Sequence, residues 1–240
     1  MTLLVNTRPG GCSGMVEPMG EALTSAQMKA LDETTIRDHH VPSMVLMERA
    51  ALACVDVLRE DFDLGCVHVY CGPGNNGGDG IAIARLLHLA GVDVLVFLLG
   101  DPAKFSADLQ HQITIAESYG VPLFYGFTRV DTRAHETPTT GKPHNIPTTV
   151  VDAILGIGAV RAPAGEFLDV VRSMAELRNQ GTRVLAVDIP SGVNADTGAI
   201  PGEAVQADTT VTFAYPKIGL TVDPGRIVAG RVVVADIGIY

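Results

Sequence analysis

Four short segments of the sequence contain the residue types that bind nucleotides or metal ions. The first runs from Gly72 to Asp79 as Gly-Pro-Gly-Asn-Asn-Gly-Gly-Asp and fits the G-x-G-x-x-G pattern of dinucleotide-binding loops. The others are centred on Asp152, on the run Asp188–Gly192, and on Lys217. Glycines let backbone N–H groups approach a phosphate, and a following helix N-terminus adds a favourable dipole. The first segment therefore predicts a phosphate-binding turn.

The aspartate that ends this turn is unexpected beside a phosphate. Asp79 suits the helix dipole, but its charge repels a phosphate, so we expect it to face backbone donors or a ribose hydroxyl. Asn76, Asp152 and Ser191 offer amide, carboxylate and hydroxyl oxygens, which are the ligands that hard cations take. These residue types predict a cation as well as a nucleotide.

Each segment also has an interpretation without chemistry. A single G-x-G-x-x-G match is weak, and turns of glycine and asparagine are common. Asp152 and Asp188 could cap helices or accept structural hydrogen bonds, Ser191 could cap a turn, and Lys217 could be a solvated loop lysine. The seven histidines have no metal-ligand spacing and are treated as incidental.

Strands that alternate with helices must position these segments. Short apolar runs predict strands at Val67–Cys71, Asp93–Leu99, Pro122–Tyr125, Thr149–Leu155, Arg183–Ile189, Thr209–Ala214 and Arg231–Ala235. Helical periodicity predicts helices at Thr24–Asp38, Met44–Glu60, Asp79–Ala90, Ala107–Tyr119 and Glu166–Gln180. The alternation predicts an α/β fold, with a doubly wound, mostly parallel sheet and helices on both faces.

The four polar segments share one position relative to this sheet. Each follows the carboxyl end of a predicted strand, and ligands of open α/β sheets bind beyond those ends. One shared site at that edge explains the agreement better than four unrelated loops. The sheet therefore predicts that Asp79, Asp152, Asp188 and Lys217 lie near one another.

The composition limits the classes of partner. The chain of 240 residues has 47% hydrophobic residues, a formal net charge of -10 and a pI of about 5.0. An acidic chain argues against duplex nucleic acid or an anionic membrane surface as the main partner, but it is compatible with a small anionic ligand. No stretch approaches the ~20 apolar residues of a membrane span. The four cysteines have no metal spacing, which favours a reducing, cytoplasmic location.

The length and the local patterns predict one domain with two irregular segments. Residues 1–22 have no basic segment followed by a long apolar run, and we expect a flexible leader there rather than a signal peptide. Residues 23–240 then form a single α/β domain of ordinary size. Residues 126–148 are polar and rich in Thr, Pro and His, and predict an exposed insertion.

Taken together, the motifs resemble the YjeF N-terminal domain family, the NAD(P)H-hydrate epimerases. The matching segments are LTSAQMKALD, LMERAA, GPGNNGGDG, VDAILGIG, AVDIPSGVNADTG and TVTFAYPKIGL, in this order from about Leu23 onward. The resemblance implies a Rossmann-like fold and the repair of NADHX and NADPHX, the hydrated forms of NADH and NADPH. It also implies a homodimer, for which we expect the two helices before the first strand to provide the interface. In some relatives such a domain is fused to a dehydratase domain, which could also hold here.

The resemblance also implies roles for individual residues. The substrate would be held by two loops, which are Asn75, Asn76, Gly77, Gly78 and Asp79 in the first and Gly156, Ile157, Gly158, Ala159, Val160, Arg161 and Ala162 in the second. A potassium ion would bind Asn76, Asp152 and Ser191, and Asp188 would also contact substrate. Lys217 matches the usual lysine after the sixth strand.

For catalysis we expect acid–base chemistry at the hydrated nicotinamide carbon without consumption of a redox cofactor. Asp188 is the first candidate, Asp152 the second because it is tied to the cation, and Lys217 the third. One alternative is a non-catalytic, nucleotide- or RNA-linked scaffold domain of this fold, which the intact motifs and the acidic charge disfavour. Another is an ordinary Rossmann oxidoreductase; Asp101 is nearly placed to hold a ribose, but the chain has no Tyr-x-x-x-Lys.

Overall fold

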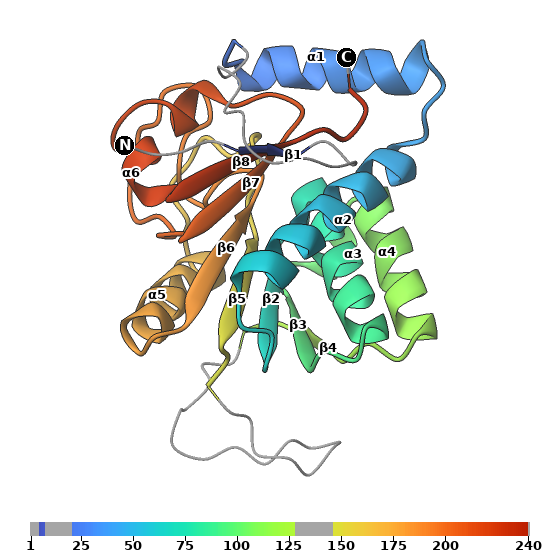
Figure 1. Cartoon of the computed structure of the whole chain (residues 1–240), viewed down its shortest axis with the longest axis vertical. Coiled ribbons are helices and arrows are strands. Elements are labelled where there is room, and N and C mark those ends of the chain that lie inside the picture. The colour runs from blue at the N-terminus through green and yellow to red at the C-terminus, as the bar shows by residue number, and fades with distance from the viewer. Residues whose placement is uncertain (1–4, 8–20, 128–145, 240) are drawn as a thin grey trace.

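A single eight-stranded sheet organises the chain, and all of its strand pairs are parallel. The computed structural model describes residues 5–7, 21–127 and 146–239 (Figure 1). The strand order is β1-β8-β7-β6-β5-β2-β3-β4. The strands are β1 (Val5–Thr7), β2 (Val67–Cys71), β3 (Val94–Leu98), β4 (Leu123–Tyr125), β5 (Thr149–Ala153), β6 (Arg183–Val187), β7 (Thr209–Phe213) and β8 (Arg231–Ala235). The predicted α/β fold class is confirmed.

Helices cover both faces of this sheet (Figure 1). On one face lie α2 (Ser43–Asp61), α3 (Asn75–Leu89) and α4 (Ala107–Ser118), and on the other lies α5 (Glu166–Asn179). The first helix, α1 (Ser25–Arg37), runs across the edge at which the strands end. The short helices η1 (Pro102–Lys104), η2 (Ile218–Leu220) and α6 (Gly225–Val228) lie in the connections.

The apolar strands are buried from both sides, as a parallel sheet requires. In β2, Val69 packs into the core beneath α2, α3 and α4, whereas the next residue, Tyr70, packs into the core beneath α5. The Tyr70 ring stacks on Phe97 of β3 with ring centroids 4.9 Å apart. Consecutive side chains of a strand point to opposite faces, so one continuous apolar run supplies both cores.

Helix α3 begins four residues earlier than the sequence predicts. It starts at Asn75 rather than Asp79, so the turn Gly72–Asp79 includes the first turn of the helix. Glycine has a low helix propensity, which is why local reasoning assigns these residues to a loop. Close packing accounts for Gly78 of this turn and for the next glycine, Gly80: a Cβ on Gly78 would lie 2.6 Å from Cε of Met47, and one on Gly80 would lie 2.6 Å from Cβ of Ala153.

Two irregular segments of the prediction lie mostly outside the described residues. The leader, residues 1–22, contains one unpredicted element, since β1 pairs in parallel with β8 at the sheet edge. The prediction of a flexible leader otherwise concerns residues 1–4 and 8–20, which lie outside the described part of the chain. The prediction of an exposed insertion mostly concerns residues 128–145, which also lie outside it.

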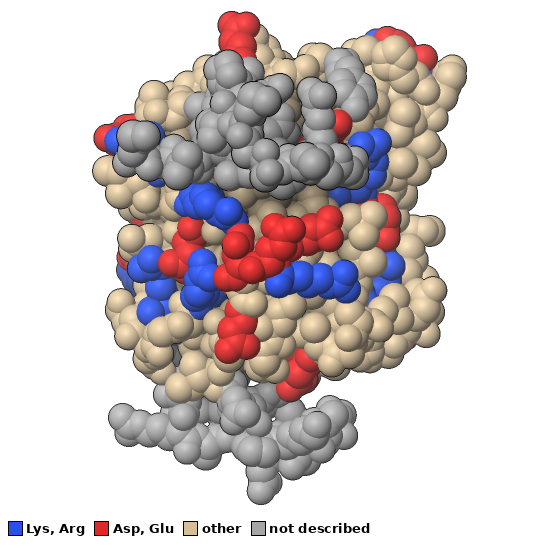
Figure 2. All heavy atoms as spheres, viewed as in Figure 1, with Lys and Arg blue, Asp and Glu red and all other residues tan. Residues whose placement is uncertain are grey.

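Acidic and basic side chains are interleaved on the face of the molecule drawn in Figure 2, where they form a band across its middle. Ion pairs such as Arg172–Glu203 and Arg178–Asp208, with N–O distances of 2.6 and 3.0 Å, neutralise charges of opposite sign locally. Within the described ranges, no helix is long and apolar enough to cross a membrane.

Candidate functional site

A pocket of about 710 Å³ opens at the carboxyl edge of the sheet. Its walls come from the N-terminal turn of α3, the loop after β5, the ends of β6 and β7, helices α1 and α2, and the C-terminal segment after β8. The volume is in the range of small-molecule and cofactor sites. The pocket therefore lies where the strand ends place the predicted polar segments.

The glycine-rich turn forms the wall at the start of α3. Gly74 is the N-cap and provides no capping side chain, so the first N–H groups of the helix remain open to the pocket. Gly72 and Gly77 make this approach sterically feasible. A Cβ on Gly72 would lie 1.8 Å from the Ile154 carbonyl oxygen, and one on Gly77 would lie 1.9 Å from the Gly72 carbonyl oxygen. The result is an N-terminal helix turn suited to a phosphate.

Asp79 lines the same pocket one turn into α3. Burial raises its pKa well above the usual range, and the negative charges of Asp188 and Asp32 add to this effect, whereas Lys217 opposes it. The raised pKa favours a neutral carboxyl that can donate as well as accept a hydrogen bond. Such a group fits the predicted ribose contact better than a permanent anion does.

Asp152 and Ser191 form a fully buried pair behind the pocket wall. The Ser191 hydroxyl donates to Oδ1 of Asp152 at 2.6 Å, and the Ser191 N–H donates to Oδ2 at 2.8 Å. The Ser191 hydroxyl in turn accepts from the Leu155 N–H at 2.9 Å. Burial raises the pKa of Asp152 to about 6, against the lowering effect of the hydrogen bonds from Ser191.

Asn76 is the third predicted cation ligand, and its side chain is incompletely satisfied. Its amide nitrogen and oxygen are buried and have no hydrogen-bond partner among the described residues. A Cβ added to Gly156 would lie 3.2 Å from Cβ of Asn76, so Asn76 contacts the segment Ile154–Gly156. The same segment donates hydrogen bonds to the other two ligands: the Ile154 N–H to Oδ1 of Asp152 at 3.3 Å and the Leu155 N–H to the Ser191 hydroxyl at 2.9 Å. An unpaired amide beside a carboxylate and a hydroxyl is a donor set that fits a hard cation such as potassium.

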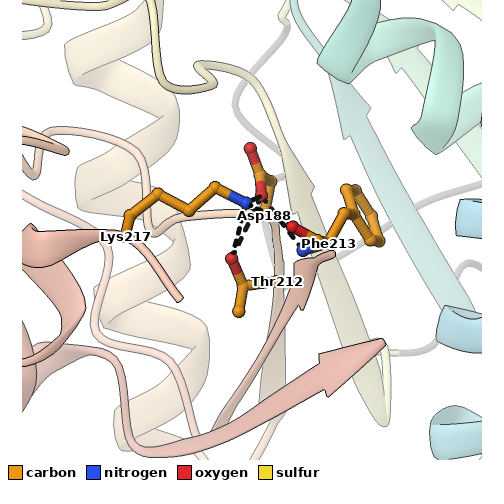
Figure 3. Close-up of polar contacts among 4 residues, drawn as sticks. All are labelled: Asp188, Thr212, Phe213 and Lys217. Carbon is orange, nitrogen blue, oxygen red and sulfur yellow. Dashed lines mark hydrogen bonds and ion pairs between the residues drawn. The ribbon is translucent and has the colours of Figure 1, made fainter. Parts of the chain in front are cut away.

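Asp188 and Lys217 form a buried ion pair at the ends of β6 and β7 (Figure 3). Nζ of Lys217 donates to Oδ1 of Asp188 at 2.5 Å, to Oγ1 of Thr212 at 2.9 Å and to the Phe213 carbonyl at 2.9 Å. Oδ1 of Asp188 also accepts from the Thr212 hydroxyl at 3.1 Å. All of these bonds go to Oδ1, so Oδ2 has no hydrogen-bond partner within the described residues and is available to a ligand.

The backbone of Asp188 is held in the left-handed region, with φ of +67°. Few residues other than glycine adopt this conformation, and it costs of order 1–3 kcal/mol where the surrounding structure enforces it. The N–H of Asp188 donates to the Val211 carbonyl at 2.7 Å, which fixes the turn against β7. The strained backbone of Asp188 therefore directs its side chain toward Lys217 and the pocket.

The structure brings only part of the second predicted loop to the pocket. Gly156, Ile157, Gly158 and Ala159 line it, whereas Val160, Arg161 and Ala162 are not part of its wall and are exposed. Gly77 and Gly78 lie behind the wall, where they allow close packing. Asp152 and Ser191 also lie behind it, while Asn75, Asn76, Asp79, Asp188 and Lys217 line it.

Sequence reasoning missed the contribution of the N-terminal helices. Ser25, Met28, Lys29 and Asp32 of α1 line the pocket, as does Asp108 of α4. The segment LTSAQMKALD contains the α1 residues, so the family resemblance was the available signal. Nothing in the local pattern shows that this helix faces the strand ends 150 residues later in the chain.

The fold and the site define a doubly wound α/β protein with a nucleotide-type pocket at the carboxyl edge of a parallel sheet. The profile of the family described as YjeF-related protein N-terminus matches residues 43–219. The chain belongs to this family, and the resemblance seen in the sequence is confirmed.

Curated relatives match nearly the whole chain. An NAD(P)H-hydrate epimerase of Levilactobacillus brevis is 42% identical over 223 residues, which cover 92% of this chain and 96% of the relative. The proteins of the same name from Limosilactobacillus reuteri and Oenococcus oeni are each 46% identical, covering 91% of this chain and 96% and 97% of the relatives. A crystal structure of the yeast protein YNL200c superimposes with a TM-score of 0.67 at 23% identity, covering 84% of this chain and 83% of that one, which supports the fold.

Proposed function

We propose that this chain is a metabolite-repair isomerase that interconverts the R and S forms of hydrated NADH and NADPH. The observation that carries the proposal is the Asp188–Lys217 pair, which leaves one carboxylate oxygen facing a pocket beside the phosphate-binding turn of α3. Relatives that are 42–46% identical over more than 90% of the chain carry the name NAD(P)H-hydrate epimerase. No redox cofactor is consumed, because epimerisation leaves the oxidation state of the ring unchanged.

Substrate binding follows from the chemistry of the pocket walls. The open N–H groups at the start of α3 suit the phosphate of the nicotinamide half, and Asp79 suits its ribose. Residues 156–159, in the loop after β5, form another wall of the pocket. The hydrated ring then extends toward Asp188 and Lys217 at the ends of β6 and β7.

Asp188 performs the proton transfer in this proposal. The hydrated ring carbon carries a hydroxyl beside the ring nitrogen. A proton that Oδ2 of Asp188 has taken up from solvent passes to the hydroxyl, so that the C–O bond breaks, water leaves, and the nitrogen lone pair forms the C=N bond of an iminium. Water then adds to the other face, the electron pair of the C=N bond returns to nitrogen, and the added water releases a proton to solvent.

The other two catalytic candidates take supporting roles. Asp152 does not line the pocket, and both of its oxygens accept hydrogen bonds from Ser191. Lys217 donates three hydrogen bonds in a position that is 1% exposed, which suits an orienting cation rather than a proton donor. We therefore assign Asp152 to the cation site and Lys217 to the orientation of Asp188.

The proposal is tested by an epimerisation assay with purified R and S forms of NADPHX. Either form, incubated with the protein, should approach the same equilibrium mixture much faster than without protein, as followed by chromatography. The outcome that contradicts the proposal is an unchanged rate for both NADHX and NADPHX in the presence of potassium.

We further propose that a potassium ion is held by Asn76, Asp152 and Ser191 behind the pocket wall. When bound, the ion supplies positive charge beside a substrate that carries phosphates. Its expected effect is on stability, because a ligand that binds only the folded state stabilises it by about 2.7 kcal/mol at 100-fold excess over Kd. Potassium should therefore raise the melting temperature more than lithium does at equal ionic strength.

The Asn76 variant tests this cation site. Asn76→Ala should abolish the difference between the two salts, since it removes the unpaired buried amide. Asn179→Ala at the exposed end of α5 should retain the difference. Equal melting curves of the unmodified chain in both salts would rule out a specific potassium site.

A homodimer is also part of the proposed function, and we keep its interface on the two helices before β2. Met28, Leu46 and Met47 of these helices are buried within the chain, so the contact must come from exposed apolar residues. Val45 and Leu52 are 46% and 45% exposed and lie seven residues apart on the outer face of α2. We propose that this face meets its copy across a two-fold axis.

Light scattering at micromolar concentration should give the mass of a dimer, and the double change Val45→Lys and Leu52→Lys should give soluble monomer. Ile227→Lys, which alters an exposed residue on α6, should leave the dimer intact. A monomeric mass for the unmodified chain contradicts the dimer.

We place the enzyme in the cytoplasm, where the buried thiols of Cys54, Cys66 and Cys71 remain reduced.

A further inference from the structure

We propose that Asp32 of α1 is a second acid–base residue, which acts on the face of the substrate ring opposite Asp188. The inference rests on the proposed epimerase function and adds a residue outside the two expected substrate loops. Epimerisation requires water to leave from one face of the ring and to add to the other. One fixed carboxylate serves one face, so a second group on the far wall of the pocket completes the reaction.

Helix α1 presents one face to the pocket. Ser25, Met28, Lys29 and Asp32 all line it, and their spacing of three and four residues places them on the same side of a helix. Met28 is buried, and Thr35 continues this inward face. Glu33 belongs to the outer face, where its side chain is 58% exposed. Asp32 is therefore the carboxylate that α1 directs into the pocket.

The start of α1 is fixed to the loop that carries Lys217. Leu23 forms a parallel bridge with Lys217, with the Leu23 N–H bonded to the Pro216 carbonyl at 2.9 Å and the Ile218 N–H to the Leu23 carbonyl at 3.1 Å. The Ser25 N–H and hydroxyl both donate to the Asp196 carboxylate, at 2.5 and 2.9 Å. The same loop thus positions both the Asp188–Lys217 pair and the helix that crosses above it (Figure 1).

The side chain of Asp32 is not committed to a structural contact. It forms no hydrogen bond or ion pair with any described residue, in contrast to Asp152 and Asp188. Partial burial raises its pKa, and the negative charges of Glu33, Asp108 and Asp188 add to the effect. Such a carboxyl exchanges protons more readily near neutral pH than an exposed aspartate does.

Two further acids line the pocket, but their positions differ. Asp79 lies one turn into α3 and Asp108 lies in the first turn of α4, on the wall where the helix N-termini lie. Asp188 projects from the end of the sheet, and Asp32 alone comes from the helix that crosses over the strand ends. A ring bound between the sheet edge and this helix would present one face to Asp188 and the other to Asp32.

Proton balance is simple with two carboxyl groups. Asp188 gives a proton to the leaving hydroxyl, the C–O bond breaks, and water departs as the iminium forms. Asp32, as a carboxylate, accepts a proton from the water that adds to the opposite face, and the electron pair of the C=N bond returns to nitrogen. One proton has moved from Asp188 to Asp32, and proton exchange with solvent water returns both groups to their starting forms before the next turnover.

The test measures oxygen exchange and inversion together in ¹⁸O-labelled water, with the rates without protein subtracted. The unmodified chain should incorporate label and invert the carbon at comparable rates. In Asp32→Asn, Asp188 still expels water and returns labelled water from its own face. We therefore expect inversion to fall by about 10²-fold or more, while label uptake falls by less than about tenfold. Asp32→Glu should restore part of the inversion.

The matched control is Asp169→Asn, which makes the same Asp-to-Asn change at an exposed acid of α5 outside the pocket and should leave both rates unchanged. Equal losses of inversion and label uptake in Asp32→Asn would show a structural role and overturn the proposal, as would unchanged inversion. The proposal would also be overturned if Asp108→Asn, and not Asp32→Asn, lost inversion selectively. An unmodified chain that does not invert NADPHX refutes the proposed function itself, which is a separate outcome.

Discussion

Asp188→Asn should slow epimerisation by about 10²–10⁴-fold, the usual contribution of a general acid–base residue. Asparagine tolerates the left-handed backbone of this position better than other non-glycine residues do, so the turn should keep its shape. The amide oxygen can still accept from Lys217 and Thr212, but it cannot deliver a proton. Loss of the charged acceptor should cost about 1.5–3 kcal/mol of stability, which leaves a folded chain.

Rates at saturating substrate and the far-ultraviolet circular dichroism spectrum would be measured for this variant and for Asp169→Asn. Asp169 is an exposed acid in the first turn of α5 and does not line the pocket. Its variant should match the unmodified chain in both measurements. A folded Asp188→Asn protein with near-normal turnover would remove Asp188 from the reaction.

Lys217→Met should produce the largest loss of stability. Methionine keeps most of the apolar length of the side chain, but it removes the three hydrogen bonds of Nζ and leaves the Asp188 carboxylate without its cation. Breaking a buried ion pair by removing one partner typically costs about 3–5 kcal/mol. We expect a decrease of this size in the free energy of unfolding, measured by urea denaturation at an unchanged m-value.

Lys104→Met is the matched control for this experiment. The Lys104 side chain is 78% exposed, and its ion pair with Asp101 spans 3.9 Å at the surface. Its loss should change stability by no more than about 0.5 kcal/mol. Similar effects of the two lysine variants would mean that the buried pair with Asp188 adds nothing beyond a surface contact.

The sequence by itself determined the sheet and the edge at which the site lies. Apolar runs such as Val67–Cys71 predict buried strands because both faces of a parallel sheet exclude water. The carboxyl ends of parallel strands meet at one edge, so Asp79, Asp188 and Lys217 could be placed near one another before their contacts were known. These inferences depend on local periodicity, which is visible in the sequence, and on a general rule of sheet topology.

The tertiary structure alone decided which polar residues face the pocket. Asp152 and Asp188 occupy equivalent positions in the sequence pattern, yet Asp152 is enclosed by Ser191 while Asp188 turns toward Lys217 and the cavity. The start of α3 at Asn75 depends on how closely its glycines pack against neighbouring segments. The position of Asp32 at the pocket depends on the bridge between Leu23 and Lys217, which are 194 residues apart in the sequence. Packing between distant segments sets these contacts, and no local pattern encodes the distance between them.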